Sequence, residues 1–175
     1  MVKFRKSSLA LCLLCLSAFV QAKDELVWMW PEDQARMLNY ATMFEGAPYA
    51  FGARKPSSED CSSFIQKIFT LIGVELPRSS REQALDPRFV EVPIEERRTG
   101  DLIFFKNTYR RGISHVAYSI DNEKIIHASP KSKKIARDTL TPRHPLWKRI
   151  HSVRRWKHIM EESHLRPQFA WDDKI

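Results

Sequence analysis

The residues of this sequence best suited to chemistry are one cysteine and two histidines. Cys61 follows Asp60 at the start of an apolar stretch with helical spacing. Unpaired N–H groups at a helix N-terminus favour a negative charge, so this position favours the thiolate, the nucleophilic form of cysteine. His115 and His127 lie in two later stretches with strand character. These residues predict nucleophilic catalysis, in which His115 acts as the base beside Cys61 and His127 orients the ring of that base.

The length of the turn between the two strands decides whether the histidines meet. Side chains alternate faces along a strand, so an odd-length loop centred on Asp121 places His115 and His127 opposite each other on one face. We expect such a loop, or a bulge that restores the same parity. The shared face should point toward the N-terminal end of the helix that starts at Cys61, with the small Ala117 on the same face letting the helix approach. The opposite face should carry Val116, Tyr118 and Ile120.

Cysteine and histidine are also zinc ligands, which gives the same side chains a second interpretation. Cys61, His115 and His127 lack the close ligand pairs of common zinc sites, so we expect no metal and no other cofactor. A single histidine without such context is more often a structural residue. We expect that of the other four: His144, His151, His158 and His164.

Residues 1–22 have the pattern of a secretory signal peptide. A basic start is followed by an apolar run over residues 9–20 and by the small-residue ending Val20-Gln21-Ala22. The run is shorter than the roughly 20 residues that a membrane-spanning helix needs. Cys12 and Cys15 each follow a leucine, where a lipoprotein cleavage site needs a small residue. We therefore expect export to the periplasm or the cell wall, with no stable membrane anchor.

Removal of that segment would leave Cys61 as the only cysteine, so no internal disulfide would form. Exported proteins usually use their cysteines in disulfides, and an exposed free thiol oxidises. The ordinary alternative is a buried cysteine that serves as a small apolar side chain. Export favours a catalytic use of the thiol.

The 175 residues suit one packed domain, which we place at residues 23–160, with a polar tail at 161–175. Helix signals come first: Pro31 opens a helix that ends at Gly46, and Asp60 caps one that ends near Gly73. A short third helix begins at Ser79 with a capping-box spacing. Strand signals then cover residues 101–105, 113–120, 124–128 and 151–156. Helices followed by an antiparallel sheet predict an α+β fold.

The net charge of +8 is concentrated in one region, because residues 106–157 hold 14 basic and three acidic side chains. Such a region attracts anions from beyond contact distance. Nucleic acid, anionic lipid and anionic cell-wall polymer all fit the charge, and an ordinary solvated surface is the alternative. Export argues against nucleic acid as a partner.

Six motifs occur in the order and approximate spacing of the NlpC/P60 cysteine peptidases, and the chain resembles that family from residue 46 to residue 156. The resemblance implies a papain-like NlpC/P60 fold, with N-terminal helices packed on an antiparallel β-sheet, and peptidoglycan endopeptidase activity. The motifs are Gly46-Ala47-Pro48-Tyr49, Asp60-Cys61-Ser62-Ser63-Phe64, Leu76-Pro77-Arg78-Ser79-Ser80 with Gln83, Gly100-Asp101-Leu102-Ile103-Phe104-Phe105, Ser114-His115-Val116 and Ile126-His127-Ala128.

The resemblance also assigns roles. It implies that Cys61 is the nucleophile, His115 the base and His127 the third, polar member of the triad. The Tyr49 hydroxyl and the backbone N–H of Cys61 would bind the oxyanion. The residues expected to line the substrate groove are Tyr49, Asp60, Ser62, Arg78 and Ser80.

The implied reaction is hydrolysis of amide bonds in peptidoglycan stem peptides through a thioester on the cysteine. The bond is either the one between D-γ-glutamate and the diamino acid or one within a D,D cross-link. We expect a monomer without a nucleic-acid partner. Two alternatives stay open: acyl transfer or amide hydrolysis on a non-wall substrate, and a non-catalytic module that binds wall polymer.

Overall fold

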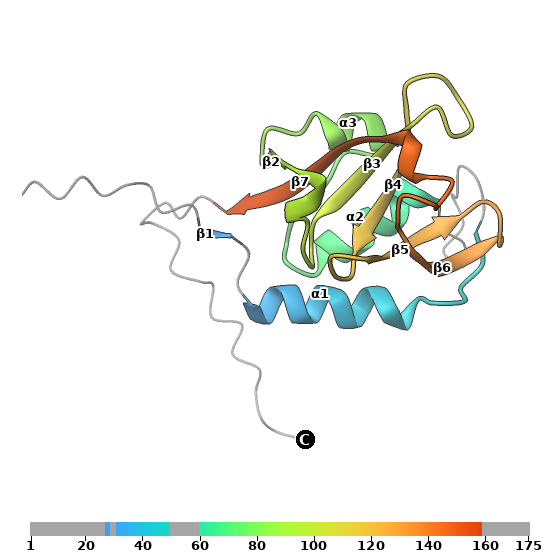
Figure 1. The fold of residues 1–175 in the computed structure, drawn as a ribbon. Helices are drawn as coiled ribbons and strands as arrows, with labels where there is room; N and C mark the ends of the chain where they lie inside the picture. Colours follow the sequence, from blue (N-terminus) through green and yellow to red (C-terminus); the bar gives the residue numbers. More distant parts are fainter. Residues whose placement is uncertain (1–26, 29–30, 50–59, 159–175) are drawn as a thin grey trace, which may run out of the picture.

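The computed structural model describes residues 27–28, 31–49 and 60–158. Within these residues an antiparallel sheet packs against three α-helices (Figure 1), which confirms the α+β fold. The predicted signal peptide at 1–22 and the predicted tail at 161–175 lie outside the described residues. The described helices include none long and apolar enough to cross a membrane.

The three predicted helices form, each with the expected end signals. Helix α1 covers Pro31–Met43 and is followed by Gly46, whose positive φ of 88° suits glycine. Helix α2 covers Cys61–Thr70, and α3 covers Ser80–Ala84 with the predicted capping box. Figure 1 shows α1 and α3 on opposite sides of α2, and α2 also contacts strands β4 and β5. Short 3-10 helices cover Ile94–Glu96 and Trp147–Arg149.

The described strands form one sheet in the order β1-β7-β3-β4-β5-β6, and β2 also pairs with β7. Strands β3, β4, β5 and β7 match the sequence prediction, whereas β1, β2 and β6 were missed. Strand β6 exposes charged side chains along an edge of the sheet, and this composition resembles that of a loop. The bounds are Val27–Trp28 (β1), Phe89–Val92 (β2), Leu102–Lys106 (β3), Ile113–Ser119 (β4), Lys124–Ser129 (β5), Lys134–Thr139 (β6) and Ile150–His158 (β7).

The β4–β5 hairpin has the predicted odd parity. Tyr118 pairs with Ile126 in the ladder, and the Ile120 N–H donates to the Lys124 carbonyl at 2.8 Å. Residues 121–123 therefore form the turn, and the Asp121 carboxylate accepts the N–H groups of residues 123 and 124. The turn is therefore centred on Asn122 and not on Asp121, so His115 and His127 share one face as diagonal neighbours instead of lying directly opposite each other as predicted.

The face of β4 that packs against α2 is the opposite of the one predicted. Val116 and Tyr118 lie in one core cluster with Phe64 and Ile65 of α2. Ala117 belongs to a second cluster on the other side of the sheet, so its predicted contact with the helix is wrong. The large apolar side chains of α2 pack on the face of β4 that offers large apolar partners. The second cluster contains Ile103, Phe105, Ala117, Ile125, Leu140 and Val153.

A buried ion pair joins the start of β3 to β7. Asp101 is 1% exposed, and its carboxylate accepts two hydrogen bonds from Arg155, each of 2.8 Å. The backbone N–H of Arg98 donates to the same carboxylate at 2.9 Å. Both side chains are largely withdrawn from water. Removing one partner should therefore lower the free energy of unfolding far more than removing one partner of an exposed ion pair.

We predict that Asp101→Ala lowers the free energy of unfolding by about 3 kcal/mol, because Arg155 loses the carboxylate that compensates its buried charge. The matched control is Glu91→Ala, which removes an exposed partner of Arg154 on the neighbouring strand. The control should cost less than about 1 kcal/mol. Denaturant unfolding followed by tryptophan fluorescence measures both, and equal losses would contradict the structural role of Asp101.

Candidate active site

Cys61 is the first residue of α2, where the helix begins against the sheet. Asp60 is the N-cap, and its carboxylate accepts the Ser63 N–H at 2.8 Å. The side chain of Cys61 is buried, with 7% exposure, and its thiol is free. The backbone N–H of Val116 in β4 interacts with the sulfur. Val116 follows His115, so the sulfur lies beside the backbone of the predicted base.

The limited pairing of β4 with β5 leaves room for the Cys61 sulfur beside the backbone of β4. All residues of β4 and β5 are described, and two ladder pairs join the strands: Tyr118 with Ile126 and Ser119 with Ile125. Both pairs lie at the turn end of the hairpin. Toward His115, no further ladder pairs join these two strands. The start of α2 therefore reaches β4 at an open stretch of backbone.

Burial keeps the thiol protonated. It raises the pKa of Cys61 to about 11, and the charge of Asp60 acts in the same direction. The backbone N–H groups of Val116, Ser62 and Cys61 itself lower the pKa, but by less. The prediction that the helix N-terminus favours the thiolate is therefore wrong for the free protein, because desolvation outweighs the effect of the helix end.

The two histidines form a buried chain that ends on a carboxylate. His115 Nε2 lies 2.7 Å from His127 Nδ1, and His127 Nε2 lies 2.9 Å from an oxygen of Asp138. Each histidine is 2% exposed. The predicted contact between the two rings is present, and it orients His115 through His127.

Burial has the opposite effect on the base. It lowers the pKa of His115 well below 6.5, and the neighbouring His127 adds to the effect. A neutral thiol therefore lies beside the strand of a neutral imidazole. Such a pair suits transfer of the thiol proton to His115 at the moment of attack.

Asp138 is a site residue that sequence reasoning missed. It lies on β6, a strand that was not predicted. Its hydrogen bond with His127 holds the pKa of Asp138 below the ordinary value, and the partial burial that works against this is weaker. One signal was available: Asp138 is one of three acidic residues in the basic region 106–157, and the other two lie in the β4–β5 turn.

An open cavity of about 200 Å³ lies over the thiol. All five residues predicted for the substrate groove line it together with Cys61. The structure thus brings together four separate segments of the sequence. The lining contains Tyr49, Asp60, Cys61, Ser62, Arg78, Ser79, Ser80, Tyr109 and Arg110.

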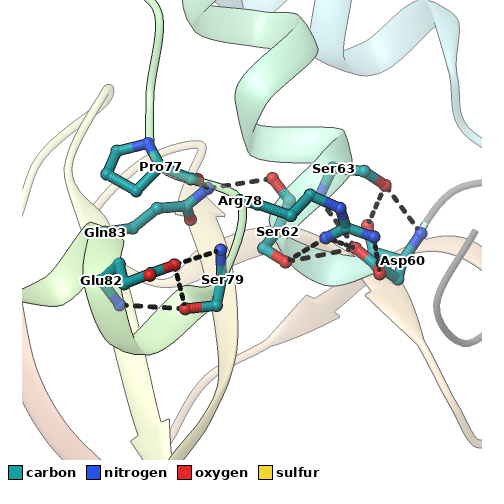
Figure 2. A network of polar contacts seen from close by, with 8 residues as sticks. All are labelled: Asp60, Ser62, Ser63, Pro77, Arg78, Ser79, Glu82 and Gln83. Carbon is teal, nitrogen blue, oxygen red and sulfur yellow. Dashed lines mark hydrogen bonds and ion pairs between the residues drawn. The ribbon is translucent and has the colours of Figure 1, made fainter.

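The polar floor of this cavity is held by one network, shown in Figure 2. Arg78 donates to both carboxylate oxygens of Asp60, at 2.6 and 3.1 Å, and to the Ser62 hydroxyl at 3.0 Å. Gln83 donates to the carbonyls of Ser62 and Pro77 and so joins α3 to the start of α2. The network holds the segment that begins at Arg78 against the first turn of α2.

Besides Cys61, the cavity residues Asp60 and Tyr49 have shifted pKa values, as does Tyr109, whose pKa burial raises. Burial works to raise the pKa of Asp60, but hydrogen bonds from Arg78 and the Ser63 N–H outweigh it and lower the pKa. Asp60 is therefore charged at neutral pH. Burial raises the pKa of Tyr49 to about 12, and a thiolate at Cys61 would act in the same direction, as the charge of Asp60 does. The Tyr49 hydroxyl consequently stays a hydrogen-bond donor.

Tyr109 and Arg110 are also residues that the sequence did not single out. They lie in the loop between β3 and β4, which closes through the Asn107 N–H and the Gly112 carbonyl at 2.9 Å. Asn107 adopts a φ of 55° and Gly112 a φ of 78°, as a tight turn requires. The Arg-Arg pair after Tyr109 was counted only as part of the basic region.

Of the four remaining histidines, only His144 and His151 have described side chains, because the side chain of His158 and the whole of His164 lie outside the described part of the chain. His144 reaches the carboxylate of Asp138 at 3.6 Å, which sequence reasoning did not anticipate. His151 is exposed on β7. Within residues 27–28, 31–49 and 60–158, no group of three or more histidine, cysteine or acidic residues is arranged to hold a metal ion.

We predict that alkylation of Cys61 by iodoacetamide is slow at neutral pH and speeds up about tenfold per pH unit below the thiol pKa. The reason is that a group with a pKa near 11 is a small fraction thiolate at pH 7. Peptide mass spectrometry assigns the label to Cys61, and the unfolded protein gives the reference rate. A rate independent of pH between 6 and 9 would instead show a resting thiolate.

Comparison with known proteins gives the same family at the levels of sequence and structure. The NlpC/P60 family model matches residues 46–155. The gamma-DL-glutamyl hydrolase of Bacillus subtilis is 33% identical over 68% of this chain and 28% of its own length. The gamma-D-glutamyl-L-lysine dipeptidyl-peptidase of the same organism is 32% identical over 60% of this chain and 35% of its own. The chain thus spans about a third of the length of these curated relatives.

A solved structure also matches. An NLP/P60 family protein of Staphylococcus aureus, described as similar to a lipoprotein, superimposes with a TM-score of 0.67 and 31% identity. The match covers 77% of this chain and 44% of the other. The ordered motifs, the α+β fold and the family match over residues 46–155 lead to one conclusion: the chain belongs to the NlpC/P60 family.

Proposed function

We propose that this protein is an exported cysteine peptidase that hydrolyses the amide bond after D-γ-glutamate in peptidoglycan stem peptides. The observation that carries the proposal is a buried thiol at a helix start beside the strand of a His115–His127 pair, beneath a polar cavity. The names of two relatives both specify a γ-glutamyl bond. They favour this bond over one within a D,D cross-link.

In the first step, the Cys61 sulfur forms a bond with the scissile carbonyl carbon while its proton passes to His115. The negative charge that develops on the carbonyl oxygen is met by the backbone N–H of Cys61 and the hydroxyl of Tyr49. His115 then gives the proton to the leaving amine as the C–N bond breaks. The products of this step are a free amine and a thioester on Cys61.

In the second step, a water molecule attacks the thioester. His115 takes one proton from the water as the new C–O bond forms. The C–S bond then breaks, His115 returns this proton to the sulfur, and the carboxylic acid leaves and loses its own proton to solvent. His127 orients His115 in both steps and stabilises the imidazolium that forms on it.

The cavity has groups for a substrate that is both charged and rich in amides. Asp60 offers a negative charge, Arg78 and Arg110 offer positive charges, and Ser62 and Ser80 offer hydroxyls. Stem peptides carry amino, amide and carboxylate groups. The basic region at 106–157 fits the many carboxylates of a wall polymer. The periplasm or cell wall is the proposed location, and the protein is proposed to act as a monomer without a membrane anchor.

The first alternative is acyl transfer or amide hydrolysis on a non-wall substrate by the same thiol and base. The thioester is common to both reactions, so the acceptor of the acyl group distinguishes them. The second alternative is a non-catalytic wall-binding module, against which a free thiol beside the strand of the His115–His127 pair argues.

We predict that Cys61→Ala abolishes release of peptides from purified peptidoglycan while the fold persists, because the variant removes only the sulfur atom of the proposed nucleophile. His115→Ala should abolish release as well. The matched control is His151→Ala, an exposed histidine on β7 that should retain wild-type activity. Circular dichroism checks the fold of each variant.

Mass spectrometry of the released fragments identifies the bond. We expect one fragment that ends in D-glutamate and another that begins with the free amino group of the diamino acid. Fragments cut within a D,D cross-link would contradict the proposed bond, and transfer products would support the first alternative. Wild-type hydrolysis by Cys61→Ala would refute the thioester mechanism.

A further inference from the structure

We propose that Asp138 is a positioning residue of this site, which acts through His127 to leave one defined nitrogen of His115 free to accept the thiol proton. The inference rests on the proposed function, since it assigns Asp138 a part in that mechanism. Asp138 does not line the cavity and therefore acts at a distance from substrate.

The sheet places Asp138 where it can do this. In the β5–β6 ladder Ile125 pairs with Asp138, and His127 pairs with Ala136. Asp138 and His127 are therefore diagonal neighbours on one face, within reach of each other. The carboxylate oxygen lies 2.9 Å from His127 Nε2. The next contact in the chain is the 2.7 Å one between His127 Nδ1 and His115 Nε2.

An ionised carboxylate can only accept hydrogen bonds, and this fixes the direction of the whole chain. His127 must carry its proton on Nε2 in order to donate to Asp138. When its ring is neutral, His127 Nδ1 then has a lone pair and accepts from His115 Nε2. Neutral His115 is left with its lone pair on Nδ1, the nitrogen that remains to accept the proton of Cys61.

Asp138 is itself held from the other side. His144 Nε2 lies 3.6 Å from the same carboxylate oxygen that contacts His127. The Leu146 N–H donates to His144 Nδ1 at 3.2 Å, so His144 carries its proton on Nε2, toward Asp138. Two imidazole N–H groups thus converge on one oxygen, although 37% of the Asp138 side chain is exposed. This arrangement limits the directions in which the carboxylate can turn.

The charge of Asp138 also matters during the reaction. His115 becomes cationic when it accepts the thiol proton, and both histidines are buried. A buried cation needs a compensating charge. Asp138 supplies that charge through His127, so its removal should slow the chemical step and leave substrate binding almost unchanged.

The decisive variant is Asp138→Asn, which keeps the shape of the side chain and removes its charge. We expect kcat on peptidoglycan fragments to fall about tenfold or more, with KM within about twofold of wild type. Asp138→Glu restores a carboxylate at a partly exposed position and should recover part of kcat. An Asp138→Asn variant with wild-type kcat would overturn the proposal.

The matched control is Glu45→Gln. Glu45 forms an ion pair of 2.8 Å with Arg137, the neighbour of Asp138 on β6. The control removes a carboxylate next to the same strand without touching either histidine of the chain. It should leave kcat unchanged, and a loss equal to that of Asp138→Asn would show a general effect of charge rather than positioning.

A double-mutant comparison tests whether Asp138 acts through His127. In a His127→Ala background the Asp138→Asn change should have no further effect on kcat, because the contact it would weaken is already gone. Independent effects that multiply would contradict the proposed route.

Nitrogen NMR of the imidazole rings provides a readout that needs no turnover. Wild-type protein should show the proton on Nε2 of both His115 and His127, and Asp138→Asn should lose that preference at His127, because an amide both donates and accepts. A wild-type His127 with its proton on Nδ1 would overturn the proposal. If the protein releases no stem peptides, the proposed function fails while the ring protonation still tests Asp138.

Discussion

The first turn of α2 meets the backbone of β4, and the geometry of the site depends on this contact. Asp60 caps the helix and so determines where it begins, which places Cys61 at its first position. Because β4 and β5 pair only near their turn, the Val116 N–H is available to the sulfur. The helix packs its large apolar side chains on one face of the sheet, while His115 packs against Phe105, which belongs to the cluster on the other face. The thiol therefore meets the strand that carries His115 at a point where β4 and β5 are not paired.

Burial then sets the protonation of the pair. The same loss of solvent raises the pKa of Cys61 and lowers that of His115, so both groups are neutral in the free protein. A neutral pair keeps one transferable proton within the site. The ionised Asp138, at the more exposed end of the chain, gives the two imidazoles a fixed donor direction. His115 is thus kept neutral by burial, and its orientation depends on the carboxylate of Asp138 through His127.

The segments that line the cavity over the thiol are each held in shape by hydrogen bonds between residues near in the sequence. The Asp60 and Ser79 capping boxes place two helix starts side by side, and Arg78 links them through its hydrogen bonds to Asp60. A closed loop between β3 and β4 presents Tyr109 and Arg110 at the same cavity. The reacting group and the recognition groups are therefore positioned by separate local interactions.

The sequence by itself determined the class of fold, the helix caps, the odd parity of the hairpin and the shared face of His115 and His127, because these depend on neighbours near in the chain and on side-chain alternation along strands. The order of its motifs also indicated the family. Only the tertiary structure decided which face of β4 meets α2, that the thiol is neutral, and that Asp138 completes the histidine chain. Those properties arise from packing, desolvation and the pairing of an edge strand, which bring together residues that no local pattern relates.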